Sequence, residues 1–438
     1  MAETSRDLFA SRLGMLAATL GSSVGLGNIW KFPALTGEHG GASFLLVYIL
    51  STLVVGLPLM IAELLIGRST RSNAYQAFKT LSSNRFWWII GGLGIAGAVT
   101  ILSFYSDVAG WVFAYIPKAL TGSVHTQDPA VAKEAFSSLL ACPWKSLFWQ
   151  WLVLGLTASV ILRGASGGIE KANKVMMPIL FFLFVALGIY VFTLPGASGG
   201  YRYIFTIKPE GLLDPYVWIY AFGQAFFSLS VAGNGSVIYG SYLSKNECIP
   251  SSARNVALFD TIAALLAAFV IIPAMAAGGA ELDAGGPGLM FIYLVHVMNG
   301  MAGGRIVAMV FFLCVSFAGV TSIINLYEAP VASLQEKLGL KRVPATAVIH
   351  VIGLAAALCI QAIVSQWMDV VSIYICPLGA LLAAVMFFWI GGKKLVLESV
   401  NLGARKPIGG WYYPAGKYVY CASVLVALIA GAILGGIG

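Results

Sequence analysis

The chain alternates long apolar stretches with short polar connections over nearly all of its 438 residues. An apolar stretch of about 20 residues is long enough to cross a bilayer as a helix. Eleven stretches meet this requirement, near residues 12–36, 41–67, 87–120, 146–163, 172–195, 217–243, 254–278, 304–336, 344–364, 371–392 and 416–437. The pattern therefore predicts an all-α polytopic membrane protein.

Composition and charge agree with this prediction and add an orientation. The chain is 59% hydrophobic and only 10% charged, and most of its 26 basic residues fall in connections that share one side if the N-terminus is cytoplasmic. Positively charged connections stay on the cytoplasmic side. The net charge of +8 is therefore explained without nucleic acid. Eleven spans then put the C-terminus on the extracytoplasmic side.

The first span is interrupted near its centre, within Leu20–Pro33 (LGSSVGLGNIWKFP). Its glycines Gly21, Gly25 and Gly27 each weaken a helix by roughly 1 kcal/mol. Unwound backbone at membrane depth is tolerated only where it lines a cavity or is buried in protein. Its carbonyls and hydroxyls suit small hard cations, and the N–H groups of the second half-helix can bind a carboxylate. A glycine-rich packing face between helices is the alternative.

A second interruption, Ser230–Gly235, lies five spans later. The third span of each half, 87–120 and 304–336, is far longer than about 20 residues and must tilt or project beyond the bilayer. Because five is odd, the second copy is inverted in the membrane. We expect a 5+5 inverted repeat with broken helices 1 and 6, and a substrate site at the midplane. The expected units are 1–195 (tail and spans 1–5), 196–395 (spans 6–10) and 396–438 (span 11).

Motifs along spans 1 to 10 resemble the neurotransmitter:sodium symporter family, in particular its bacterial eleven-span amino-acid transporters. They are GSSVGLGNIWKFP, Glu38–Gly41, Gly56-Leu57-Pro58 with Glu63, Tyr105 before Trp111, Gln224–Ser230 and Ala318–Ser322. The resemblance implies a leucine-transporter-like fold and sodium-coupled import of a neutral amino acid across a bacterial plasma (inner) membrane by alternating access. The link between two interrupted spans in inverted halves and a midplane substrate site is itself drawn from this family, so it does not support the resemblance independently.

The resemblance implies two sodium ions. The residues matching the family's second sodium site are Gly21, Val24, Ala318, Thr321 and Ser322. They provide neutral carbonyl and hydroxyl oxygens, whereas a divalent ion usually takes carboxylates. A Thr-Ser pair in a helix would otherwise only bond its own backbone carbonyls. This set therefore favours a monovalent cation.

The residues matching the first sodium site are Ser23, Asn28, Ser228 and Asp260, the last in place of the family's Asn. A carboxylate in an apolar span is costly unless it faces the bundle and a cation. Chloride-dependent members bind their anion beside this site, at positions matching Tyr48, Gln224 and Ser228. Asp260 is expected to supply that charge permanently, so transport is predicted to be chloride-independent. A protonated Asp260 with a packing role is the alternative.

The substrate site is also implied by the resemblance. Its matching residues are Ser23, Leu26, Gly27, Ile101, Tyr105, Phe227, Ser230, Gly233, Ser322 and Leu326. Many members place a Phe where this chain has Gly233, so an enlarged pocket is expected, with the polar residues Asp107 and Asn325 nearby in sequence. A large side chain with a polar tip, such as that of tyrosine, would fit, and tryptophan and other large neutral amino acids are the competitors.

Two charged pairs match the family's gates. Lys31 and Asp369 correspond to the outer pair, with a lysine point charge in place of the usual arginine fork. Arg6 and Glu336 correspond to the inner pair that ties the N-terminal tail to the end of span 8. The alternative is that these residues are only the solvated ends of spans.

Other functional classes fit the sequence less well than transport. A membrane-embedded enzyme needs clustered catalytic groups, and the four histidines, His39, His125, His296 and His350, are dispersed. An ion channel and a non-transporting amino-acid sensor of the same fold stay open as alternatives. The expected partners are the amino acid and the lipid bilayer, without nucleic acid. The sequence does not determine the oligomeric state, the number of sodium ions or any counter-transport.

Overall fold

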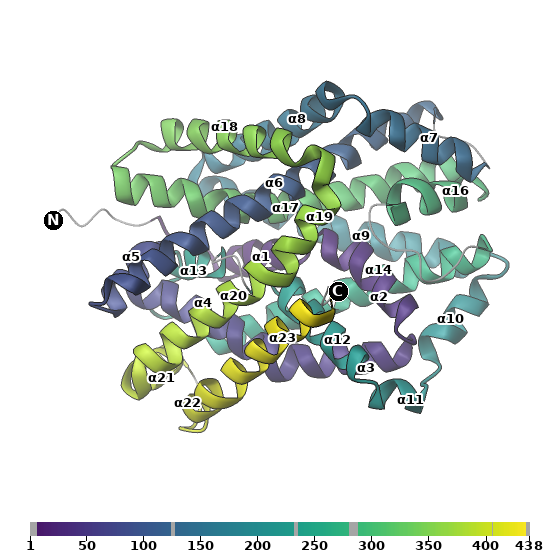
Figure 1. The fold of residues 1–438 in the computed structure, drawn as a ribbon. Helices are drawn as coiled ribbons and strands as arrows, with labels where there is room; N and C mark the ends of the chain where they lie inside the picture. Colours follow the sequence, from purple (N-terminus) through teal and green to yellow (C-terminus); the bar gives the residue numbers. More distant parts are fainter. Residues whose placement is uncertain (1–6, 124–127, 232–234, 280–287, 405, 435–438) are drawn as a thin grey trace.

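A computed structural model describes residues 7–123, 128–231, 235–279, 288–404 and 406–434, and in these ranges every regular element is a helix. The all-α prediction is confirmed for them (Figure 1). The helices of the first half are α1 (Arg12–Ser23), α2 (Phe32–Glu38), α3 (Ala42–Ser51), α4 (Leu57–Thr70), α5 (Ala74–Leu81), α6 (Arg85–Thr121), α7 (Pro129–Leu140), α8 (Pro143–Ile161) and α9 (Lys171–Phe192).

The second half contains two short helices, an interrupted pair and the remaining long helices. Their bounds are α10 (Ala197–Phe205), α11 (Pro209–Leu213), α12 (Pro215–Ser228), α13 (Gly235–Ser241), α14 (Ile249–Ala277), α16 (Leu294–Asn299), α17 (Gly304–Leu338), α18 (Arg342–Ile360), α19 (Val364–Val370), α20 (Cys376–Val385), α21 (Gly392–Asn401), α22 (Tyr412–Pro414) and α23 (Cys421–Leu434).

Short helical turns of other pitch continue several helices. The π-helical turns are Gly27–Lys31, Thr52–Gly56, Ala165–Glu170, Leu289–Tyr293, Val371–Ile375, Met386–Ile390 and Ala415–Tyr420, and a 3-10 turn spans Gln361–Ile363. Such turns insert a residue or tighten a helix locally and are frequent at functional sites. Two of them, Gly27–Lys31 and Val371–Ile375, contribute residues to the cavity described below.

Seven helical runs among the described residues are long and apolar enough to cross a membrane. They are Ala42–Thr70, Arg85–Thr121, Ala165–Phe192, Ile249–Ala277, Gly304–Leu338, Arg342–Ile390 and Tyr412–Leu434. The predicted spans 12–36 and 217–243 correspond to interrupted helices, and span 146–163 corresponds to α8. The predicted spans 344–364 and 371–392 both fall, except for residues 391 and 392, in the run Arg342–Ile390. The number eleven therefore stays a prediction.

The two longest helices, α6 and α17, pack along each other at the centre of the bundle (Figure 1). At about 1.5 Å per residue, the 37 residues of α6 span roughly 55 Å, well beyond an apolar bilayer core of about 30 Å. The expectation of two unusually long third spans is confirmed. Helix α1 lies against α9, α14 and α17, which brings its broken end into the interior.

Close backbone contact joins α13 to α4. A Cβ atom added at Gly67 would lie 1.9 Å from the Val237 carbonyl oxygen, and one at Gly240 would lie 2.4 Å from that of Leu64. Glycine is the residue that allows this approach, as is typical of helix interfaces in membranes. The second half of the broken span 6 is thereby held firmly against span 2.

Candidate functional site

The first interruption begins at one extended residue, and the two amide groups that follow it are bonded by side chains. Helix α1 ends at Ser23, and Val24 is extended, with φ −70° and ψ 104°. The Gly25 amide donates to Asn28 Oδ1 at 3.1 Å, and the Leu26 amide donates to the Tyr105 hydroxyl at 2.7 Å. The backbone hydrogen bonds that the helix loses at the break are thus replaced by bonds to side chains of the π-helical turn and of α6.

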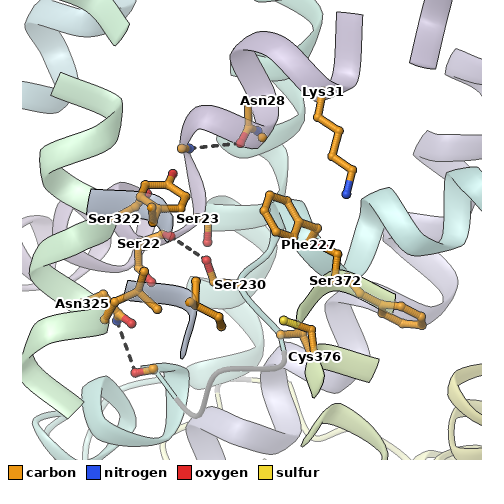
Figure 2. Close-up of a pocket in the computed structure, with 18 of the residues that line it drawn as sticks. Ser22, Ser23, Asn28, Lys31, Phe227, Ser230, Ser322, Asn325, Ser372 and Cys376 are labelled. Atoms are coloured by element: carbon orange, nitrogen blue, oxygen red, sulfur yellow. Dashed lines mark hydrogen bonds between the residues drawn. The ribbon is translucent and has the colours of Figure 1, made fainter. Parts of the chain in front are cut away.

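The second interruption follows α12 and meets the first. Ser230 adopts a left-handed conformation (φ 52°), which turns the chain away from the helix axis. Its hydroxyl donates to the Ser22 carbonyl at 2.6 Å, and this bond joins the two breaks directly (Figure 2). Across the cavity, Asn325 Nδ2 donates to the Gly235 carbonyl at 3.3 Å. The predicted position of this break is confirmed at its described ends, Ser228 and Gly235.

A cavity lies between the two breaks (Figure 2). Of the residues predicted to bind substrate, it is lined by Ser23, Gly27, Ile101, Tyr105, Phe227, Ser230, Ser322 and Leu326. Leu26 lines a small adjoining pocket with Phe227 and Met368. Gly233 lies outside the described residues. The structure therefore brings the rest of the predicted set together around one space.

Several residues of the cavity were missed by the sequence analysis. They are Ser22, Gly25, Gly223, Phe226, Val231, Gly235, Ser372, Cys376 and Pro377, together with Asn28, Lys31 and Asn325, which had been assigned elsewhere or left without a role. Ser372 lies in the π-helical turn between α19 and α20, and Cys376 is the first residue of α20. Both come about 350 residues after the first break, and no local pattern marks them. Among the described residues, the buried hydroxyls of Ser22 and Ser372 have no hydrogen-bond partner. They leave polar groups available to a ligand.

The residues assigned to the second sodium site face one another between α1 and α17. The Ser322 hydroxyl lies 3.5 Å from the Gly21 carbonyl and 3.4 Å from the Val24 carbonyl. The Thr321 hydroxyl donates to the carbonyls of Phe317 (2.9 Å) and Ala318 (3.1 Å) in its own helix. The donor set consists of neutral carbonyl and hydroxyl oxygens, which fits a small monovalent cation.

The residues assigned to the first sodium site form a hydrogen-bonded cluster. Asn28 Nδ2 donates to Ser228 Oγ and to Asp260 Oδ1, both at 2.9 Å, and Ser228 Oγ donates to Asp260 Oδ2 at 2.5 Å. The Tyr48 hydroxyl donates to Ser228 at 3.0 Å. Asp260 is fully buried, and none of the ion pairs recorded for the described residues includes it. The Ser23 hydroxyl bonds the Thr19 carbonyl in its own helix, whereas the group of Ser23 assigned to this site is its backbone carbonyl.

The outer gate residues are arranged differently from the expected ion pair. The Lys31 ammonium lies 4.6 Å from the centre of the Phe227 ring, a cation–π contact, and Figure 2 shows the lysine extending toward that ring. No ion pair between Lys31 and Asp369 is present among the described residues. Phe227 in turn packs on Gly27, where an added Cβ would lie 2.4 Å from the ring.

The predicted partners of the N-terminal tail lie close to the segment before α1. Phe9 packs edge-on against Tyr239 and Tyr242, with ring centres 5.7 and 5.8 Å apart. Glu336 accepts bonds from the Asn73 amide at 3.0 Å and from its side chain at 2.6 Å. Arg6, its predicted partner, lies outside the described residues.

Two further carboxylates were missed by the sequence analysis. Glu328, fully buried, pairs with Arg342 at 2.7 Å and accepts a bond from the Tyr242 hydroxyl. Glu170 accepts from the Ala10 amide at 2.6 Å and the Ser11 hydroxyl at 2.7 Å. Glu170 thereby fastens the segment before α1 to the turn that leads into α9. Glu328 links Tyr242, a neighbour of Phe9, to the start of α18.

Comparison with known proteins decides the family. A model of the family described as "Sodium:neurotransmitter symporter family" matches residues 6–132 and 144–433. The chain belongs to this family. It is a family of multi-pass membrane transporters, not of enzymes, and the predicted resemblance is confirmed.

Relatives of this symporter-family chain come from bacteria, archaea and animals. It is 36% identical over 334 residues to the "uncharacterized sodium-dependent transporter YhdH" of Bacillus subtilis, covering 76% of this chain and 74% of the relative. It is 30% identical over 463 residues to the sodium-dependent transporter MJ1319 of Methanocaldococcus jannaschii, covering 99% and 91%. A neutral amino acid transporter of the mouse, B(0)AT3, is 29% identical over 306 residues, covering 62% and 48%.

A solved structure matches the whole fold. The crystal structure of MhsT in complex with L-phenylalanine superposes with a TM-score of 0.88 at 33% identity, covering 97% of this chain and all of that one. The predicted leucine-transporter-like architecture is confirmed by this match.

Proposed function

We propose that the protein is a sodium-coupled symporter that imports a large neutral amino acid, with tyrosine favoured, by alternating access. The observation that carries the proposal is the cavity between the two broken helices, whose exposed backbone and hydroxyl groups adjoin two separate sets of cation-ligating oxygens. The relatives named as sodium-dependent transporters and the L-phenylalanine bound to MhsT support it.

The cavity offers distinct partners for the two ends of an amino acid. A carboxylate can accept from the amides near Gly27 and from the Tyr105 hydroxyl, whose oxygen accepts from the Leu26 amide. The ammonium group can donate to the carbonyls and hydroxyls around Ser22 and Ser230. Ile101 and Leu326 supply apolar surface, while Asn325 supplies a polar group for a hydroxyl-bearing side chain.

We further propose two sodium ions as co-substrates and no requirement for chloride. Asp260 supports both points because its buried carboxylate has only neutral donors around it, in Asn28 and Ser228, and so lacks a compensating charge. A buried charge without a partner is strongly unfavourable, and sodium beside it would balance it. Tyr48 donates to Ser228 of the same cluster, and Gln224 donates to the carbonyl of Gly27, next to Asn28. These are the positions at which chloride-dependent members are expected to hold their anion.

The proposed setting follows the charge pattern of the sequence. The protein is placed in a bacterial plasma (inner) membrane with its N-terminus cytoplasmic and its C-terminus extracytoplasmic. Residues 1–195 and 196–395 are proposed as the two inverted repeats, with 396–438 as the additional span.

Uptake by purified protein in liposomes tests the proposal. Radiolabelled L-tyrosine should accumulate above its external concentration when sodium is outside, and accumulation should collapse when the sodium gradient is dissipated. L-Phenylalanine, L-tryptophan and L-leucine as unlabelled competitors rank the specificity. Equilibration without accumulation would favour a channel, and sodium-dependent binding without uptake would favour a sensor. Either result would overturn symport.

A further inference from the structure

Asn173, in the first turn of α9, carries a buried oxygen that the proposed sodium sites do not use. Its side chain is fully buried. Its Nδ2 group donates to the Ile169 carbonyl at 2.8 Å, and since a carbonyl can only accept, this bond fixes which end of the amide points toward Ile169. The other end, Oδ1, has no hydrogen-bond partner among the described residues.

This oxygen lies against the proposed second sodium site. A Cβ atom added at Gly21 would lie 1.9 Å from Asn173 Oδ1 and 3.0 Å from Thr321 Cβ. The amide oxygen therefore touches Gly21 on the side that also faces Thr321. Both residues belong to the proposed site, and Ser322 lies 3.5 Å from the Gly21 carbonyl. Only glycine at position 21 leaves room for this approach.

An unpartnered oxygen in this place calls for a ligand. Leaving a buried polar group without a partner costs about 1–3 kcal/mol. The surrounding groups are the carbonyls of Gly21 and Ala318 and the hydroxyls of Thr321 and Ser322, and the two hydroxyls already donate to or lie near backbone carbonyls. A small cation among these oxygens would satisfy all of them, and side-chain amide oxygens are ordinary ligands of hard cations.

We infer that Asn173 Oδ1 is a further oxygen ligand of the second sodium site. The inference rests on the proposed function, which supplies the site itself. Its consequence is that sodium joins three helices, because α9 then contributes beside α1 and α17. Residues 165–170, which lead into α9, form a π-helical turn, so this ligand stands just after an irregular stretch of backbone.

Binding of radioactive sodium to the purified protein in detergent tests the inference without requiring transport. Asn173→Leu keeps the branched shape and removes the oxygen. The sodium concentration for half-saturation should rise roughly tenfold, as expected for the loss of about 1.4 kcal/mol of binding free energy. Lithium should compete better relative to sodium in this variant, because ligand number and cavity size set the selectivity between cations. A purely structural role of Asn173 would not shift that ratio.

Asn401→Leu is the matched control. Asn401 also donates to a carbonyl four residues earlier, that of Leu397, but it stands at the far end of α21. Its sodium affinity and lithium-to-sodium ratio should equal those of the unmodified protein.

Asn173→Asp keeps an oxygen at this position and adds negative charge, so it decides the matter if the leucine variant does not fold. It should bind sodium more tightly than the unmodified protein. Unchanged sodium affinity in either folded Asn173 variant would overturn the inference while leaving the proposed symport intact. An unmodified protein that binds no sodium would overturn the proposed function, and this ligand with it.

Discussion

The two sets of cation-ligating oxygens are built on different principles. The first set, Asn28, Ser228 and Asp260, consists of side chains from three separate segments that bond one another at 2.5–2.9 Å and include a carboxylate. The second set has no charge. The Thr321 hydroxyl bonds two carbonyls of its own helix, at 2.9 and 3.1 Å, and the Ser322 hydroxyl reaches the carbonyls of Gly21 and Val24 only at 3.5 and 3.4 Å.

This difference indicates which site responds to movement of α1. Distances of 3.4–3.5 Å are at the limit of a hydrogen bond, so the second set depends on how closely α1 approaches α17. The side chains of the first set already satisfy one another's hydrogen-bonding groups. Its negative charge attracts a cation regardless of how closely α1 approaches α17. We therefore expect the neutral set to govern coupling, and the charged set to govern the ionic requirements of transport.

The largest effect is expected at the neutral set. Thr321→Ala combined with Ser322→Ala removes two oxygen ligands, and uptake driven by a sodium gradient should fall about 100-fold or more, since each lost partner of a buried polar group costs about 1–3 kcal/mol. Uptake into proteoliposomes measures this. Ser316→Ala removes a hydroxyl from the same helix that bonds only the Leu313 carbonyl, and it should leave uptake unchanged. Normal uptake by the double variant would remove this site from the mechanism.

A somewhat smaller effect is expected at the charged set. Asp260→Asn should lower uptake about 30-fold or more, because losing one partner of a desolvated charge pair costs about 2–5 kcal/mol. Chloride should partly restore uptake in this variant, while the unmodified protein should transport equally well in chloride and in gluconate. Asp107→Asn neutralises another buried carboxylate, on α6, and should create no response to chloride. A chloride requirement in the unmodified protein would contradict the role given to Asp260.

Replacing the ion tests both sets without a mutation. Lithium in place of sodium should reduce uptake by the unmodified protein several-fold, because a cage of several neutral oxygens suits an ion larger than lithium, as ligand number and cavity size determine selectivity. Uptake at matched concentrations of the two ions, with choline as the inert replacement, gives the ratio. Equal rates in both ions would show that the neutral set does not select by size.

The smallest effect is expected from Ser228→Ala. Asp260 loses one donor but keeps the bond from Asn28, so the sodium concentration for half-maximal uptake should rise only a few-fold, in line with about 0.5–1.5 kcal/mol for one hydrogen bond. Transport should stay independent of chloride because the carboxylate is still present. A loss as severe as that of Asp260→Asn would mean that the hydroxyl itself is indispensable.

Much of this architecture could be predicted because it depends on local chemistry. Apolar runs require helices where backbone groups cannot reach water, and glycines weaken them where they cluster. Both interruptions were therefore placed correctly, within Leu20–Pro33 and at Ser230–Gly235, and so were the two long helices α6 and α17. The family resemblance then named Asn28, Ser228 and Asp260, which the structure brings within hydrogen-bond distance.

Contacts between distant segments were decided only by the tertiary structure. Ser372 and Cys376 line the cavity together with residues of the first break, which precede them by more than 300 positions. Lys31 likewise lies over the ring of Phe227, which belongs to α12. Asn173 faces Gly21 across the interface of α9 with α1. Hydropathy and glycine content determine the structure of each segment by itself. Packing between separate helices fixes how each helix is rotated, and this rotation decides which side chain meets which oxygen.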